Sequence, residues 1–63
     1  MKIAVICANG KAGRLIVREA LDRGLDVTAV VRGENRSAAA KAVTKDLFAL
    51  TAEDLKDFDV VVN

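Results

Sequence analysis

The amino-acid sequence predicts an α/β fold with one parallel sheet of about four strands and helices that flank it. Two apolar runs, residues 3–7 and residues 26–31, carry this prediction, because both are nearly continuous and contain many β-branched side chains. Such runs are typical of strands that are buried on both faces. A segment of helical periodicity separates the two runs, and a helical connection favours parallel over antiparallel neighbours.

The helix between these two strands is predicted from its single apolar face. Residues 8–13 have the composition of a turn that leads into the helix, and Gly24 stands where a C-terminal cap is expected. We therefore expect a right-handed strand–helix–strand unit. The apolar positions recur at helical spacing: Ala12, Leu15, Ile16, Ala20 and Leu21.

The second half of the chain predicts shorter elements. Residues 32–36 read as a polar loop, residues 37–41 as one or two turns of helix, and residues 42–44 as a short third strand. Another helix is expected to begin at Thr51, whose hydroxyl can accept from main-chain N–H groups, with Asp54 three residues further on.

Residues 59–62 return to the pattern of a strand, and the valines among them are expected to be buried on both faces. The sequence stops at Asn63, where such a strand would deliver its carboxyl end to a binding crevice. We therefore expect either that the chain is the N-terminal portion of a larger protein or that its strand edge is covered by another copy in a homo-oligomer.

Length and composition exclude several classes of protein. The 63 residues make one domain or a piece of one, and with one cysteine and no histidine we expect neither an internal disulfide nor a metal site. The chain is 52% hydrophobic and 30% charged with a net charge of +1. This composition excludes the kind of intrinsic disorder that arises from low hydrophobicity and high net charge.

The same composition speaks against two kinds of partner. The charges alternate in sign and the only aromatic residues are Phe48 and Phe58, so nucleic-acid binding has no support. The apolar runs are far shorter than the roughly twenty residues of a membrane span, and the first run is too short for a signal peptide. We therefore expect a cytoplasmic protein that does not bind membranes.

Residues 8–13 carry the strongest functional motif, a glycine turn between a parallel strand and the N-terminus of a helix. Such a turn presents free main-chain N–H groups and the positive end of the helix dipole, which together bind anions. The predicted contacts to a pyrophosphate are Gly10, Lys11, Ala12 and Gly13. Gly13 would also permit close packing of the helix. The alternative is that both glycines serve only the turn and its packing, and that Lys11 is a solvated charge.

This arrangement is typical of a Rossmann-type dinucleotide-binding domain, although Ala8 stands where the first glycine of the G-x-G-x-x-G fingerprint is expected. Arg32 follows the second strand where NAD-selective proteins carry Asp or Glu, and a guanidinium there can pair with the 2′-phosphate of NADP. We therefore expect NADP(H) rather than NAD(H). Arg36 is a second candidate for that phosphate and Glu34 would repel it. The alternative is that Arg32 is a solvated surface charge.

The motif and its surroundings resemble a known family. The opening run KIAVICANGKAG is similar to that of atypical short-chain dehydrogenase/reductases, whose signature there is G-A-T-G-x-x-G. With the later segments LDRG, VTAVVR, KDLF and DVVV, the chain resembles NAD(P)H-binding proteins similar to NADH-flavin reductases and the biliverdin/flavin reductase. The resemblance covers essentially all 63 residues but only the first portion of a full member. We therefore expect residues 1–63 to be the N-terminal part of a dinucleotide-binding domain.

Two loop residues depart from the family signature, because Cys7 replaces its first glycine and Asn9 its usual threonine. A side chain at position 7 is expected to narrow or tilt the loop, whereas Asn9 can still donate a hydrogen bond. We therefore expect weaker cofactor binding. Cys7 itself is interpreted as a small apolar residue at the end of a strand, with a redox-active thiol as the alternative.

The resemblance also implies a role for Asp46 and implies that the groups around the nicotinamide lie outside this chain. Asp46 matches the family position beside the adenine, where its carboxylate could accept from the exocyclic amine; the alternative is a turn residue that caps its own backbone. The family transfers hydride from the nicotinamide to flavin or a similar acceptor, and the groups lining that half of the site follow the fourth strand. No catalytic residue is therefore assigned within this chain, which contains neither histidine nor tyrosine.

The sequence therefore predicts the NADP(H)-binding portion of an oxidoreductase. Two alternatives remain open at this point. One is a non-enzymatic NAD(P)-binding sensor, and the other is a structural or oligomerising module that binds no cofactor.

Overall fold

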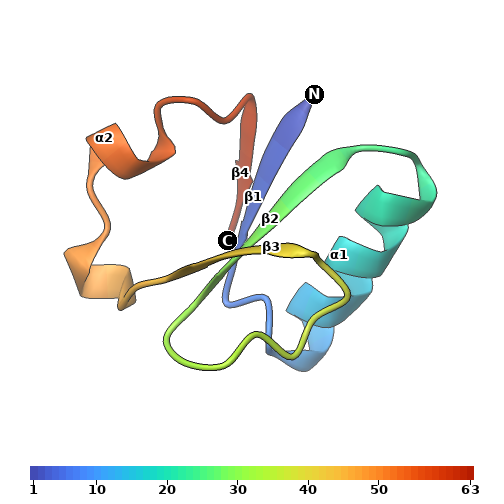
Figure 1. Cartoon of the computed structure of the whole chain (residues 1–63), viewed down its shortest axis with the longest axis horizontal. Helices are drawn as coiled ribbons and strands as arrows, with labels where there is room; N and C mark the ends of the chain where they lie inside the picture. Colours follow the sequence, from blue (N-terminus) through green and yellow to red (C-terminus); the bar gives the residue numbers. More distant parts are fainter.

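The structure is a computed structural model that describes residues 1–63. Four parallel strands form its sheet (Figure 1). The strand order is β3-β2-β1-β4, and every neighbouring pair is parallel. The predicted Rossmann-type α/β sheet of about four strands is therefore confirmed. In chain order the elements are β1 (Lys2–Ile6), α1 (Lys11–Asp22), β2 (Asp26–Val31), β3 (Lys41–Thr44), the 3₁₀ turn η1 (Leu47–Ala49), α2 (Ala52–Leu55) and β4 (Val60–Val62).

The two central strands, β1 and β2, carry most of the core. Their continuous apolar sequences follow from burial on both faces, and α1 and α2 lie to opposite sides of the strands (Figure 1). Val5 is fully buried opposite Ala29, and Val17 of α1 is fully buried as well. The buried cluster consists of Ile3, Val5, Ala8, Val17, Ala20, Val27, Ala29, Val31 and Ala39.

The end of α1 confirms the predicted glycine cap. Gly24 has a φ of +75°, the left-handed conformation that glycine adopts without a steric penalty. Its N–H donates to the Leu21 carbonyl oxygen at 2.9 Å, and the N–H of Leu25 donates to the Ala20 carbonyl oxygen at 3.1 Å. This pair of hydrogen bonds is a Schellman motif, which ends the helix and turns the chain into β2.

The short helix predicted at residues 37–41 is wrong, because side chains compete there for the backbone groups. The Asn35 side-chain oxygen accepts from the N–H of Ser37 at 3.0 Å, and its Nδ2 donates to the Ala39 carbonyl oxygen at 2.8 Å. Short polar side chains of this kind favour turns over helix. The segment is therefore an irregular connection, and β3 begins at Lys41.

The helix predicted to begin at Thr51 is confirmed, although it is only four residues long. The Thr51 hydroxyl accepts from the N–H of Asp54 at 3.3 Å, and the Asp54 carboxylate accepts from the N–H of Thr51 at 2.9 Å. This reciprocal pair is a capping box.

The outer strands β3 and β4 are more exposed than the central pair. All four residues of β3 are exposed, and Val60 and Val61 of β4 are 38% and 40% exposed. The prediction that these valines are buried on both faces is therefore wrong for this chain, because only Val62 packs against the buried cluster and even Val62 is only partly buried. None of the helices has the length and apolar character that crossing a membrane requires.

Candidate functional site

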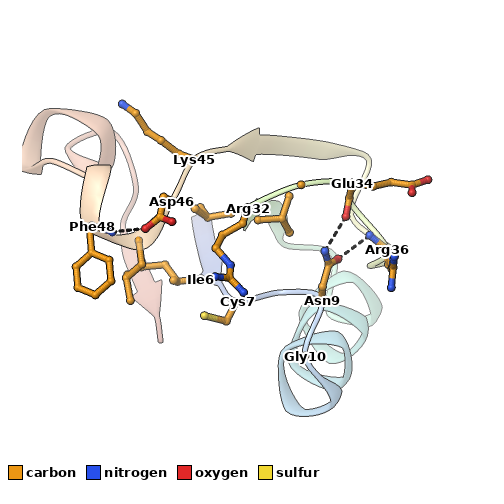
Figure 2. A pocket seen from close by; sticks show the side chains of 14 residues that line it. Ile6, Cys7, Asn9, Gly10, Arg32, Glu34, Arg36, Lys45, Asp46 and Phe48 are labelled. Carbon is orange, nitrogen blue, oxygen red and sulfur yellow. Dashed lines mark hydrogen bonds between the residues drawn. The ribbon is translucent and has the colours of Figure 1, made fainter.

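The residues that the sequence singles out lie where three strands end. Since β3, β2 and β1 are parallel neighbours, the loops that follow them leave the sheet at the same edge. These loops surround a pocket of about 490 Å³ (Figure 2). Cys7, Gly10, Arg32 and Asp46 are among the residues that line it.

The loop between β1 and α1 turns sharply at Cys7. This residue has a φ of 60°, a left-handed conformation that costs an L-residue about 1–2 kcal/mol. The Cys7 carbonyl oxygen accepts from the N–H of Gly10 at 3.0 Å, which closes the turn. Cys7 lies at the end of the strand as expected, since it directly follows β1 and its N–H donates to the Val30 carbonyl oxygen at 3.1 Å, but it is exposed and does not pack as an apolar residue. The backbone thus keeps a conformation suited to glycine while it carries a side chain.

The first turn of α1 offers main-chain donors to an anion. The helix is capped by Gly10, which has no side chain to accept a hydrogen bond, and no acidic side chain stands in the first turn. The N–H groups of Lys11, Ala12 and Gly13 form no hydrogen bond within the chain, since the first N–H that bonds backward belongs to Arg14. These donors and the helix dipole together favour a negative group at this point.

Gly13 brings this helix start close to the preceding turn. A Cβ at Gly13 would overlap the Cys7 carbonyl oxygen and lie 2.9 Å from the Cα atom of Ala8. A Cβ at Gly10 would lie 3.3 Å from the same carbonyl oxygen, a tight but less severe contact. The packing role predicted for Gly13 is therefore the one that the structure shows, whereas Gly10 lies in the wall of the pocket.

Lys11 lies outside the pocket. Together with Arg14 and Arg18 it lines a separate groove along the exposed side of α1. Arg36 lines both the groove and the pocket, so the two cavities meet at this residue. None of these four cations forms an ion pair within the chain.

Two guanidinium groups occur at the β2 side of the pocket. Arg32 follows β2 directly and Arg36 comes four residues later; both are exposed and neither pairs with a carboxylate. The loop that carries them is tied to Asn9. The Nδ2 group of Asn9 donates to the Glu34 carbonyl oxygen at 2.6 Å, and its side-chain oxygen accepts from the N–H of Arg36 at 2.6 Å (Figure 2).

Asp46 lies on the β3 side of the pocket and is the N-cap of η1. Its carboxylate accepts from the N–H of Phe48 at 2.9 Å, so the interpretation as a residue that caps its own backbone is confirmed. Phe48 lines the same wall and is 97% exposed. Sequence reasoning missed Phe48 as a site residue, because an apolar residue after a short strand reads as part of the core.

Lys45 is the one cation of this pocket that is neutralised within the chain. Its ammonium group lies 2.8 Å from the Asp54 carboxylate. The hydrogen bond from Lys45 lowers the pKa of Asp54 below its ordinary value of 3.8, and the main-chain hydrogen bond from Thr51 lowers this pKa further. The arginines therefore remain as the cations available to a ligand.

Residues 7–63 match a protein family described as NAD(P)H-binding. The chain belongs to this NAD(P)H-binding family. The match includes both departures from the loop signature, so neither Cys7 nor Asn9 removes the chain from the family.

Known relatives of this NAD(P)H-binding chain are longer proteins. The uncharacterized protein YwnB of Bacillus subtilis (strain 168) is 51% identical over 65 residues, which span all of this chain and 30% of YwnB. The crystal structure of SP1627 of Streptococcus pneumoniae TIGR4, described as "a putative NADH-flavin reductase", is 59% identical, with a TM-score of 0.93 over 97% of this chain and 29% of that protein. Lmo0794 of Listeria monocytogenes is 43% identical, with a TM-score of 0.88 over 97% of this chain and 38% of that protein.

These likenesses confirm the resemblance inferred from the loop motif and the strand pattern. The NAD(P)H-binding chain has the fold of its relatives and spans between 29% and 38% of their length.

Proposed function

We propose that the chain binds the adenosine and pyrophosphate half of NADP(H) in an oxidoreductase that passes hydride from the nicotinamide to flavin or a similar acceptor. The observation that carries this proposal is that the free N–H donors of Lys11, Ala12 and Gly13 follow directly on Gly10, in the wall of a pocket that two unpaired arginines, Arg32 and Arg36, also line. The family match and the description of SP1627 support a nicotinamide cofactor.

The residues of the pocket fit the parts of this ligand. The main-chain donors of the first turn of α1 would hold the diphosphate, because Gly10 leaves the backbone open there. Arg32, assisted by Arg36, would pair with the 2′-phosphate. Lys11 would add positive charge from the neighbouring groove.

The adenine would lie on the β3 side of the pocket. The Asp46 carboxylate accepts one main-chain N–H through one oxygen, and its other oxygen forms no hydrogen bond within the chain, so it can accept from an exocyclic amine. Phe48 offers an exposed aromatic face beside it.

The chemistry of hydride transfer belongs to the nicotinamide and its acceptor. The residues of this chain bind and orient the adenosine end, and none of them is proposed to be catalytic. The acceptor side would be formed by sequence that corresponds to the remaining two thirds or so of the relatives.

The test compares NADPH and NADH binding by calorimetric titration. Replacing Arg32 and Arg36 together by Ala is expected to weaken NADPH binding by about tenfold to a hundredfold and to leave NADH within about twofold, because only NADPH loses charge-assisted hydrogen bonds. The matched control is Arg23→Ala with Lys56→Ala, which removes the same charge from two pairs outside the pocket.

The results separate the alternatives. Turnover is measured in a longer protein that contains this chain, because the acceptor side is proposed to lie outside residues 1–63. Flavin-dependent loss of the reduced nicotinamide absorbance of NADPH there supports the oxidoreductase, and NADPH binding without turnover of any flavin favours the sensor. Absence of binding to either dinucleotide contradicts the proposal and favours the structural module.

A further inference from the structure

Asn9 joins two loops that otherwise share no hydrogen bond. The phosphate loop comprises residues 7–13, and the β2–β3 loop comprises residues 32–40. The Asn9 side chain forms both hydrogen bonds between them, to the Glu34 carbonyl oxygen and from the Arg36 N–H, each at 2.6 Å (Figure 2).

The geometry of this contact imitates a strand pair. In a parallel ladder, one residue bonds to the C=O and N–H groups that flank its partner on the neighbouring strand. The amide of Asn9 bonds in the same way to the groups that flank Asn35. An amide presents a donor and an acceptor side by side, whereas the hydroxyl of threonine, the residue usual in the resembling family, has one oxygen and a shorter reach.

Apart from the local hydrogen bonds of the Asn35 side chain, little else fixes the part of the β2–β3 loop that carries the arginines. Arg32, Gly33, Glu34 and Arg36 are all exposed, and Gly33 has open space around it. A loop with so little burial would be ordered only on ligand binding, at a cost in conformational entropy. The two hydrogen bonds of Asn9 remove part of that cost before the ligand arrives.

We propose that Asn9 is a positioning residue that holds Arg36 against the phosphate loop and thereby sets the preference of the pocket for a 2′-phosphorylated dinucleotide. This inference rests on the proposed function and adds a residue that touches no part of the ligand through its side chain. Arg36 is the residue through which Asn9 acts, because the main-chain N–H of Arg36 is itself one of the bonded groups.

The experiment is a double-mutant cycle in the full chain, with Asn9→Ala, Arg36→Ala and both together, and with Kd measured for NADPH and NADH. Asn9→Ala is expected to weaken NADPH binding by about tenfold and NADH binding by less than about threefold, so that the Kd of NADH divided by the Kd of NADPH falls. In the Arg36→Ala background the same substitution should leave that ratio unchanged, because the group that Asn9 positions is gone.

A second measurement keeps the inference testable if Asn9→Ala loosens the whole fold. Hydrogen exchange of the Arg36 amide is expected to accelerate about tenfold or more in Asn9→Thr, which keeps a polar side chain but cannot bridge both groups. The control is Glu34→Ala, which alters a side chain outside the contact and should leave the Arg36 amide protected.

The outcomes distinguish this inference from the function on which it rests. If the unmodified chain binds neither dinucleotide, or binds both equally well, the proposed NADP(H) preference fails and this inference fails with it. If the unmodified chain prefers NADPH but Asn9→Ala weakens both ligands equally, only the role of Asn9 is overturned. The role of Asn9 is established if Asn9→Ala lowers the ratio of the Kd of NADH to the Kd of NADPH in the otherwise unmodified chain and leaves this ratio unchanged in a chain that already carries Arg36→Ala.

Discussion

At the scale of single residues, the loop that should hold the diphosphate contains a conformation at odds with its sequence. Cys7 has a φ of 60°, although the resembling family places glycine there. The sequence indicates that position 7 is special, because a glycine signature is broken at that point. It does not indicate whether the backbone would change to suit the new side chain, and the structure shows that the backbone keeps its turn.

Replacing Cys7 by Gly is expected to raise the free energy of unfolding by about 1 kcal/mol, because glycine adopts a positive φ without the clash of a Cβ atom. Urea denaturation checks this prediction. Cys7→Ala is the matched control: it removes the thiol but keeps the Cβ, so it should bring no comparable gain. Equal stabilities of the Gly and Ala variants would contradict the account of strain at this position.

Gly13→Ala is expected to lower the free energy of unfolding by about 1–3 kcal/mol, since the added methyl group would collide with main-chain atoms of Cys7 and Ala8. A glycine in open space provides the comparison. Gly33→Ala introduces the same methyl group where no atom lies within 4 Å and should change stability little. Thermal or urea unfolding of the two variants shows whether close packing, and not merely loss of a glycine, explains the effect.

At the scale of elements, the sequence predicts the central strands and α1 well and the connection from β2 to β3 poorly. Continuous apolar runs and helical spacing depend on local pattern alone, so the existence of β1, α1 and β2 could be derived. The apolar face predicted for α1 is wrong in part, because Leu15 and Ile16 are exposed and Val17 is fully buried instead. The alanines at 38–40 favour a helix on local propensity, but the side chains of Asn35 and Ser37 bond to nearby main-chain groups instead. The contact of Asn9 across 25 to 27 residues of sequence could not be predicted from any local pattern.

The ion pair between Lys45, which directly follows β3, and Asp54 of α2 makes the stability of the fold depend on pH. Because the pKa of Asp54 in the folded chain lies below its ordinary value of 3.8, the folded state favours the ionised carboxylate. The stabilisation of the fold by the ionised Asp54 is therefore present at pH values above 3.8 and is lost as the pH falls through the lowered pKa.

Lys45→Met should raise the pKa of Asp54, which can be measured from the pH dependence of its carboxyl NMR signal. Lys56→Met serves as a control because Lys56 pairs with Glu53 instead. An unchanged pKa in the Lys45 variant would show that the ion pair is not what lowers it.

At the scale of the whole molecule, the core is small and the ligand pocket lies at its edge. Only 12 of the 63 residues are buried, and large apolar side chains of both outer strands remain exposed. The loops at the ends of three strands therefore have few contacts of their own, and a ligand that bridges them would add stability to the fold as a whole.

The folded chain is accordingly expected to gain stability from its cofactor. By mass action, NADPH at a hundredfold excess over its Kd should add about 2.7 kcal/mol to the free energy of unfolding. NADH at the same concentration should add less, because its Kd is expected to be higher. A thermal-shift series with both dinucleotides tests this ordering, and an equal or reversed shift would speak against the two arginines as selectivity residues.

The central claim is that the main-chain N–H groups of Lys11, Ala12 and Gly13 hold the diphosphate. Its most direct test is an NMR titration of the isotope-labelled chain with NADP⁺, in which each amide proton reports on its own hydrogen bond. We predict that these three amide signals move furthest on saturation, whereas that of Val17, buried in the same helix, moves little. If the dinucleotide binds and the signals of residues 11–13 stay where they were, the diphosphate is held elsewhere and the account is wrong.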